Sequence, residues 1–170
     1  LSGFLKREES EYDVFGAGHS STSISAAVGI DAANRLTKDT SSTIAIIGDG
    51  GLTAGMAYEA LSHAGDMKSN ILVILNDNEM SISPNVGAVH KYLTRIMTSK
   101  TVSTLRKGGK KVLEKIKPIE DLAKRVEGSA KNLIAPGLFF EELGFKYYGP
   151  VDGHDVLGLI EILENLKDKK

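Results

Sequence analysis

Two runs of apolar residues, rich in β-branched side chains, lie in the first half of the chain at Thr43–Gly48 and Ile71–Asn76. Unbroken apolar runs of this length are typical of strands that are buried on both faces of a parallel sheet. Apolar residues with helical spacing fill residues 22–36, ahead of the first run, and residues 53–64, between the two runs. This alternation predicts βαβ units and an α/β fold in which helices flank a parallel sheet.

The pattern is less regular on either side of this region. A short strand is predicted over residues 11–15, and Gly65 is predicted to end the second helix. Residues 84–130 contain helical stretches that are broken by glycine and proline. We interpret them as a mobile helical insertion whose basic run, residues 106–117, is a solvated surface segment.

The last part of the chain returns to regular spacing. We expect a helix over residues 131–143, a strand over residues 145–148 and a final helix that Asp155 caps. The 170 residues are enough for one domain with a core, and residues 1–170 are expected to form a single domain. Because the chain begins at Leu1 and stops just after an amphipathic helix, we expect a fragment with an incomplete sheet.

Composition narrows the class of protein. Hydrophobic residues make up 41% and charged residues 25%, as in soluble globular proteins. A net charge of −1 gives no electrostatic reason to expect nucleic acid or a membrane as partner. The absence of cysteine excludes disulfides, thiolate catalysis and cysteine-bound zinc. The longest apolar runs fall far short of the roughly 20 residues that span a bilayer, and no signal peptide is visible. A reducing cytoplasm is the default location that we expect.

Asp49 and Asn78 stand just beyond the ends of the two predicted strands. If these strands are parallel neighbours, their carboxyl ends form one edge of the sheet, where open α/β sheets bind ligands. A carboxylate and an amide oxygen suit a hard cation such as magnesium. Gly48, Gly50 and Gly51 would let a phosphate-bearing ligand approach the backbone, so the pattern predicts a magnesium-bridged diphosphate.

The coordination shell of such a magnesium ion can be completed from this region. Magnesium takes six oxygen ligands in near-octahedral geometry, and two diphosphate oxygens, Asp49, Asn78, a water and one backbone carbonyl would supply them. We expect that carbonyl to come from Met80, in the turn after Asn78. An isolated aspartate between glycines is most often a turn residue, and it is Asn78 that favours the metal.

The turn at residues 16–21 (GAGHSS) is a second candidate element. Backbone N–H groups at the start of the following helix could bind an anion, although Ser21 replaces the third glycine of the dinucleotide-binding pattern. A plain tight turn is equally compatible. His19 could donate to a phosphate or a reacting group, or could be a polar turn residue. The other histidines show no metal-ligand spacing and are interpreted as structural (His63, His90 and His154).

These residues resemble a known pattern. The Gly48-Asp49-Gly50 turn followed by Asn78 is similar to the thiamin-diphosphate-binding signature of transketolase-like enzymes. The wider chain resembles the family of 1-deoxy-D-xylulose-5-phosphate synthases, over almost its whole length. The matching segments are YDV (12–14), GHSSTS (18–23), TAGMA (53–57), LNDNEMSIS (75–83), FEELGF (140–145) and GPVDGHD (149–155).

The resemblance implies a transferase that condenses pyruvate with glyceraldehyde 3-phosphate and releases carbon dioxide. The product of this reaction would feed isoprenoid and thiamin synthesis. It implies a thiamin-diphosphate-binding, transketolase-like fold and a homodimer. By matched position, magnesium would be held by Asp49 and Asn78. The residues that would line the cofactor are Gly18, His19, Ser20, Gly50, Gly51 and Asn78. Gly51 stands where alanine or serine is often found, a difference that we expect to be harmless.

The enzymes of this family are much longer than the present chain, and the glutamate that activates their cofactor lies in a domain absent from it. We therefore expect the chain to anchor the cofactor, with no catalytic acid or base of its own, and to be inactive alone. Two alternatives are another transketolase-like enzyme (transketolase or a 2-oxo-acid dehydrogenase subunit) and a non-catalytic cofactor-binding module. A nicotinamide-binding fold fits poorly. Its acidic residue should follow the glycine turn by about 20 residues, whereas Asp49 follows that turn by roughly 30 residues and lies between glycines.

Overall fold

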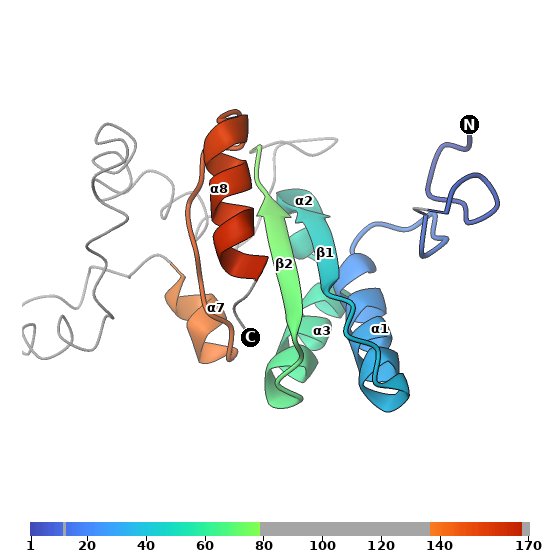
Figure 1. The fold of residues 1–170 in the computed structure, drawn as a ribbon, viewed down its shortest axis with the longest axis horizontal. Coiled ribbons are helices and arrows are strands. Elements are labelled where there is room, and N and C mark those ends of the chain that lie inside the picture. Colours follow the sequence, from blue (N-terminus) through green and yellow to red (C-terminus); the bar gives the residue numbers. More distant parts are fainter. Residues whose placement is uncertain (12, 79–136, 168–170) are drawn as a thin grey trace, which may run out of the picture. The chain divides into compact units, whose positions relative to one another are not determined.

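The structure of this chain is a computed structural model that describes residues 1–11, 13–78 and 137–167. The chain divides into two compact units. The first holds the described residues up to 78 together with residues 143–145, and the second holds residues 137–142 and 146–167. Figure 1 labels the helices and strands, which are α1 (Ser23–Thr37), β1 (Thr43–Gly48), α2 (Asp49–Leu52), α3 (Gly55–Asp66), β2 (Ile71–Asn76), α7 (Leu138–Glu142) and α8 (Val156–Lys167).

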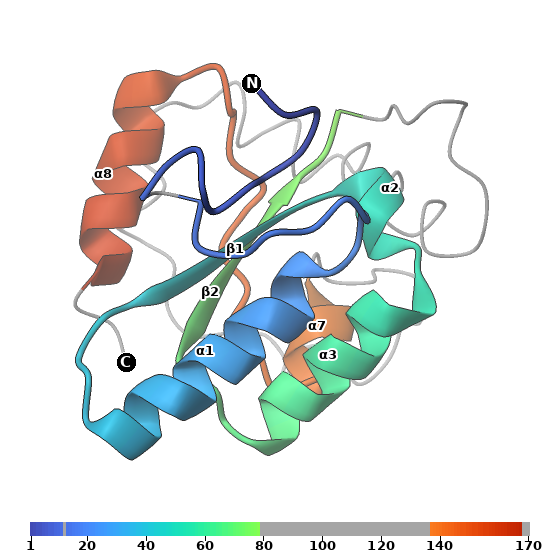
Figure 2. The same ribbon diagram turned by 90° about the vertical axis from the view of Figure 1, so that its right-hand side faces the viewer.

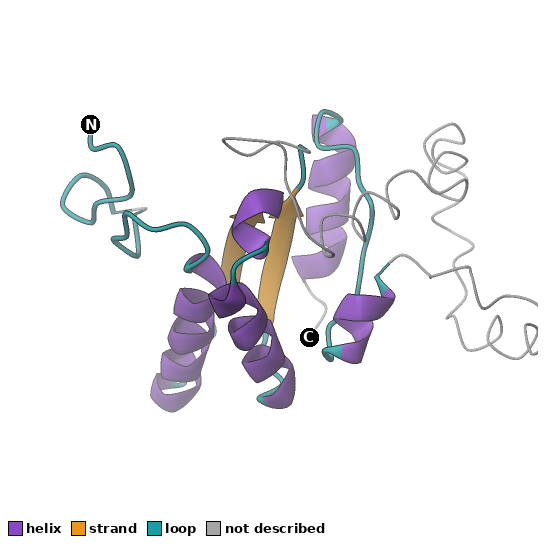
Figure 3. Cartoon of the chain, turned by 180° about the vertical axis from the view of Figure 1, so that it is seen from behind, coloured by secondary structure: helices purple, strands orange, loops and turns teal. Residues whose placement is uncertain are grey.

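β1 and β2 form a parallel two-stranded sheet in the first unit. The register pairs Thr43 with Ile71 at one end and Gly48 with Asn76 at the other. Helix α1 packs against both strands and against α3, and both helices lie on the same face of the sheet (Figure 2 and Figure 3). The predicted α/β class is therefore confirmed, and both strands have the predicted bounds.

The core of the first unit lies between the sheet and the helices α1 and α3. Along β1, Thr43, Ala45 and Ile47 are buried, whereas Ile44 and Ile46 are 54% and 64% exposed. The expected burial on both faces is therefore wrong for β1, because the described helices of this unit cover one face of the sheet. Small helical side chains permit this close packing, and the buried apolar residues of the helices are Ile24, Ala27, Val28, Leu52, Ala57, Ala60, Leu61 and Ala64.

Two charged side chains of α1, which form an ion pair with each other, bind the loop between α3 and β2. Asp31 is 6% exposed, and its Oδ2 atom forms an ion pair with Arg35 Nη2 at 3.0 Å and accepts from the Asn70 amide at 3.3 Å. The Arg35 guanidinium also donates to the carbonyl oxygens of Met67, at 3.2 Å, and Lys68, at 2.6 Å. These contacts hold the loop that leads into β2, and they fix the start of that strand against α1.

The strand predicted over residues 11–15 is not formed in the part of it that the structure describes. Residues 13–15 have irregular backbone. The Asp13 amide donates to the Ser10 carbonyl at 3.2 Å, and the Asp13 carboxylate accepts from the Lys6 amide at 3.3 Å. Local hydrogen bonds of this kind compete with a strand, and β propensity without a partner strand does not overcome them.

The strand predicted over residues 145–148 is also absent. These residues have no regular structure. In the second unit the Tyr147 ring stacks on Phe140, with ring centroids 5.9 Å apart and planes inclined by 5°. Gly137, which has a φ of 92°, lies so close to Tyr147 that a Cβ atom would collide with the ring. The segment thus packs back on α7 through its aromatic side chain.

Gly65 does not end α3, which continues to Asp66. A Cβ atom at Gly65 would collide with the carbonyl of Leu143, and Gly144 lies against the same glycine. The missing side chain therefore serves a close approach between two backbones, which is the other common reason for glycine in a helix. The prediction of a helix end at this position is wrong for that reason.

The elements predicted for the C-terminal part of the chain are confirmed in part within the described residues. Helix α7 falls within the helix predicted over residues 131–143. Asp155 caps α8 as predicted, since its Oδ1 atom accepts from the Gly158 amide at 3.1 Å. The insertion predicted over residues 84–130 lies outside the described residues. The assignment of residues 1–170 to a single domain stays a prediction.

Candidate functional site

Asp49 lies at the point where β1 ends and α2 begins. Gly48 precedes it in extended conformation, with φ −78° and ψ 160°, and Asp49 is the first residue of the short helix. Asp49 is 3% exposed. A carboxylate is expensive to bury unless a hydrogen-bonding group, an opposite charge or a metal compensates it. The sequence therefore places a buried carboxyl group at the carboxyl end of β1, where α2 begins.

Asn78 leaves the sheet at the same edge. Because Gly48 pairs with Asn76 in a parallel ladder, Asp49 and Asn78 follow the same ends of neighbouring strands. Asn78 is exposed and lies two residues past β2. The premise on which the metal prediction depends, that these strands are parallel neighbours, is confirmed. Coordination by the two side chains stays a prediction.

The turn at residues 16–21 lies against the start of α2. A Cβ atom placed on Gly51 would lie 3.7 Å from the Ser21 amide nitrogen, so the two glycine-containing turns are neighbours. Three residues at the tip of this turn, Gly18, His19 and Ser20, are exposed. The Thr22 hydroxyl donates to the His19 carbonyl at 3.2 Å. The structure therefore places the turn at residues 16–21 next to the start of α2, and the tip of this turn is exposed to solvent.

Ser21 has a left-handed backbone conformation, with φ 71°. For a residue other than glycine this conformation costs of order 1–3 kcal/mol and persists only where the surroundings impose it. The strain falls in the residue that separates the exposed tip of the turn from α1. Strained backbone of this kind is frequent in ligand-binding turns.

Alanine at Gly51 is expected to change the free energy of unfolding by less than about 1 kcal/mol. The new Cβ would lie 3.2 Å from Ile47 Cγ1, which requires that side chain to shift by a few tenths of an ångström. Alanine in place of glycine favours the helical backbone of α2 by up to about 1 kcal/mol, which offsets this cost. Thermal unfolding tests the prediction, with Gly55→Ala as control because a Cβ there meets open space. A loss above about 2 kcal/mol for Gly51→Ala alone would contradict it.

Other sequence-based candidates lie elsewhere. Met80 and His90 are outside the described residues. Within the described ranges, no group of three or more histidine, aspartate or glutamate side chains could hold a metal ion. The predicted site does not depend on such a group, because it uses a single carboxylate with an amide and a backbone carbonyl.

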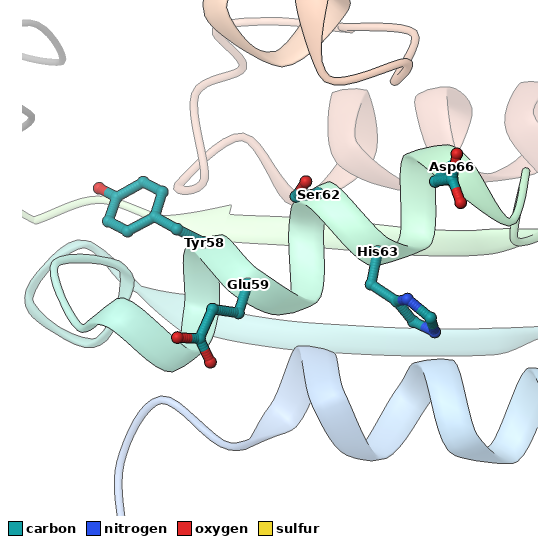
Figure 4. A pocket seen from close by; sticks show the side chains of 5 residues that line it. All are labelled: Tyr58, Glu59, Ser62, His63 and Asp66. Carbon is teal, nitrogen blue, oxygen red and sulfur yellow. The ribbon is translucent and has the colours of Figure 1, made fainter.

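An open hollow of about 670 Å³ lies on the surface of α3 (Figure 4). Burial raises the pKa of the Tyr58 hydroxyl, one of its lining groups. The hollow contains none of the predicted site residues, and all its lining comes from one helix. The lining residues are Tyr58, Glu59, Ser62, His63 and Asp66.

Sequence reasoning missed Phe4, whose ring lies against Gly18. Residues 1–10 have neither helical nor strand periodicity, so no pattern in them signals a contact with the turn. The Asp31–Arg35 pair could have been found, because aspartate and arginine four residues apart on a helix are neighbours. Its contacts with the loop before β2 could not, since they depend on how α1 and α3 pack.

The comparisons with known proteins agree with one another. The family model described as 1-deoxy-D-xylulose-5-phosphate synthase matches residues 1–170. A 1-deoxy-D-xylulose-5-phosphate synthase of Thioalkalivibrio sulfidiphilus is 58% identical over 167 residues, which cover 98% of this chain and 26% of the relative. Proteins of the same name from Cronobacter sakazakii and Escherichia coli are 55% and 56% identical over 170 residues, all of this chain and 27% of each relative.

The chain therefore spans about a quarter of the length of the curated relatives that it matches. No helix in the described ranges has the length and apolar character that crossing a membrane requires.

Proposed function

Because the chain belongs to the family of 1-deoxy-D-xylulose-5-phosphate synthases, we propose that it is the part of such a synthase that binds magnesium and the diphosphate of thiamin diphosphate. The full-length protein that contains it would be a transferase. It would condense pyruvate with glyceraldehyde 3-phosphate to 1-deoxy-D-xylulose 5-phosphate and carbon dioxide, for isoprenoid and thiamin synthesis. A homodimer and a cytoplasmic location remain predictions.

The observation that supports this proposal is the position of Asp49. It is nearly fully buried at the carboxyl end of β1, and the parallel register sends Asn78 out of the same edge. We assign Asp49 and Asn78, with the Met80 carbonyl, to magnesium. The oxygen-only donor set suits a hard cation that also binds phosphate oxygens.

The neighbouring turns suit a diphosphate. Residues 16–21 lie against the start of α2, and the tip of the turn, residues 18–20, is exposed. The glycines of the two elements are Gly18, Gly50 and Gly51. We assign these glycines, with His19 and Ser20, to the cofactor. His19 has two candidate roles in this site, which are donation of a hydrogen bond to a phosphate and support of the turn.

The bound cofactor would supply the stabilised carbanion that joins the two substrates. The residues of this chain would hold the cofactor in position. Asp49 and Asn78 would fix the metal, the metal would fix the diphosphate, and the two turns would orient that group. No described residue is assigned as an acid or base, which fits a chain that spans a quarter of its relatives' length.

Activity assays of the full-length protein test the proposed reaction. We expect carbon dioxide and 1-deoxy-D-xylulose 5-phosphate from pyruvate and glyceraldehyde 3-phosphate, dependent on thiamin diphosphate and magnesium. Transfer between pentose phosphates should be slower by orders of magnitude. Turnover of pentose phosphates without release of carbon dioxide would instead identify a transketolase and contradict the proposed substrates.

A further inference from the structure

A closed loop at the N-terminus, described over residues 2–11 and 13, packs against the candidate binding turn, and we call this loop the strap. The Ser2 amide donates to both carboxylate oxygens of Glu9, at 2.8 and 3.0 Å. The Lys6 amide donates to the Asp13 carboxylate at 3.3 Å, and the Glu9 amide donates to the Lys6 carbonyl at 2.9 Å. Each of the two carboxylates thus accepts from a backbone amide seven residues earlier in the chain. These hydrogen bonds give the strap a defined shape.

The strap contacts the turn through Phe4 and Leu5. A Cβ atom placed on Gly18 would lie 3.4 Å from Cε1 and Cζ of the Phe4 ring and 3.5 Å from Cδ1. A Cβ atom on Gly16 would lie 3.8 Å from the Leu5 carbonyl oxygen. The edge of an aromatic ring therefore rests on the backbone at the start of the GHSS sequence.

The turn needs external support, because Ser21 is held in a left-handed conformation. On its far side the turn is supported by α2, through the close approach of Gly51 to the Ser21 amide. On its near side the described support is the strap. The exposed tip of the turn, residues 18–20, is thus held between two fixed elements.

Phe4 is not a core residue of the first unit. It is 62% exposed, and the fully buried side chains of this unit are Ile24, Leu52 and Leu61. A ring that leaves most of its surface in water contributes little to folding, since that contribution scales with apolar area removed from water. Its contact with Gly18 can therefore be removed with little effect on the fold.

We propose that the strap holds residues 18–20 in the conformation that receives the diphosphate, with Phe4 as the positioning residue that acts through Gly18. The proposal rests on the proposed function. A turn that is already in its binding conformation gives up less conformational freedom when the ligand binds. If loss of the ring reduces the population of that conformation, the apparent affinity falls by the same factor.

The test compares Phe4→Ala, Phe4→Met and Leu5→Ala in the full-length protein. Thiamin diphosphate is titrated at saturating magnesium. We expect the dissociation constant to rise about 5- to 10-fold for Phe4→Ala, which corresponds to a binding-competent population of roughly a tenth to a fifth. Phe4→Met should restore most of the affinity, because methionine is flexible and long enough to reach Gly18. Leu5→Ala should change it less than about 2-fold, since Leu5 is 57% exposed and contacts Gly16 through its backbone.

Hydrogen exchange at the amides of residues 18–21, in protein without ligand, gives a second readout. Exchange should be several-fold faster in Phe4→Ala than in the unsubstituted protein, and unchanged in Leu5→Ala. Melting temperatures of all three variants should agree with the unsubstituted protein within about 2 °C.

Equal affinity and equal exchange in Phe4→Ala and the unsubstituted protein would overturn the proposal. So would equal losses in Phe4→Ala and Leu5→Ala, which would indicate general loosening. If the unsubstituted protein does not bind thiamin diphosphate, the proposed function is wrong. The exchange measurement then still decides whether the strap holds the turn.

Discussion

Alanine in place of Asp49 is expected to abolish magnesium-dependent binding of thiamin diphosphate in the full-length protein. The substitution removes the only carboxylate assigned to the metal, so the diphosphate would lose the cation that neutralises it. Synthase activity should fall at least about 100-fold, which corresponds to about 2.7 kcal/mol. Asp49→Asn should also be impaired, because it keeps one oxygen but loses the charge.

Titration calorimetry with thiamin diphosphate, at several magnesium concentrations, measures this effect. Asp39→Ala is the matched control, because it removes one carboxylate at the opposite end of β1. Asp39 is fully exposed, and hydrogen bonds from Ser41 lower the pKa of its carboxyl group. Affinity should be unchanged in this control. An Asp49→Ala protein that binds cofactor and magnesium as tightly as the unsubstituted protein would remove Asp49 from the metal site.

Asp31→Ala is expected to lower the free energy of unfolding by about 2–3 kcal/mol, because it leaves the Asn70 amide without its acceptor and Arg35 without the opposite charge beside it. The loss stays below the 3–5 kcal/mol typical of fully buried pairs, because the Arg35 side chain is 41% exposed. Since Arg35 also binds the carbonyls of Met67 and Lys68, the whole loop before β2 should loosen.

Urea unfolding and exchange of the Asn70 amide measure the two parts of this prediction. Arg35→Lys is the matched variant, because it keeps the charge beside Asp31 and loses the paired hydrogen bonds to the loop. It should be destabilised less than Asp31→Ala. Unfolding of Asp31→Ala within about 0.5 kcal/mol of the unsubstituted protein would show that the pair is a surface contact of little consequence.

The elements that sequence reasoning found are those whose signal is local. Both strands have the predicted bounds, because unbroken apolar runs rich in β-branched residues have few alternatives to a sheet. Helix α1 was predicted over residues 22–36 and spans Ser23–Thr37. The parallel pairing followed from a helical connection between the strands, which is how parallel neighbours are joined.

The elements that sequence reasoning missed depend on tertiary contacts. Residues 145–148 have strand-like composition, but Tyr147 stacks on Phe140. Gly65 looked like a helix end, but it permits a close approach by Leu143. For the candidate site, the ends of β1 and β2 could be located from the sequence. The strap could not, because Phe4 contacts Gly18 through a loop without periodicity.

The central claim is that the carboxyl edge of the β1–β2 sheet holds a magnesium-bound diphosphate. The most direct measurement is a calorimetric titration of the unsubstituted full-length protein with thiamin diphosphate, once with magnesium and once with a chelator. We predict saturable binding at one site per chain with magnesium, and a loss of at least about 100-fold in affinity without it. Equally tight binding in the chelator, or binding of NAD in place of thiamin diphosphate, would contradict the claim.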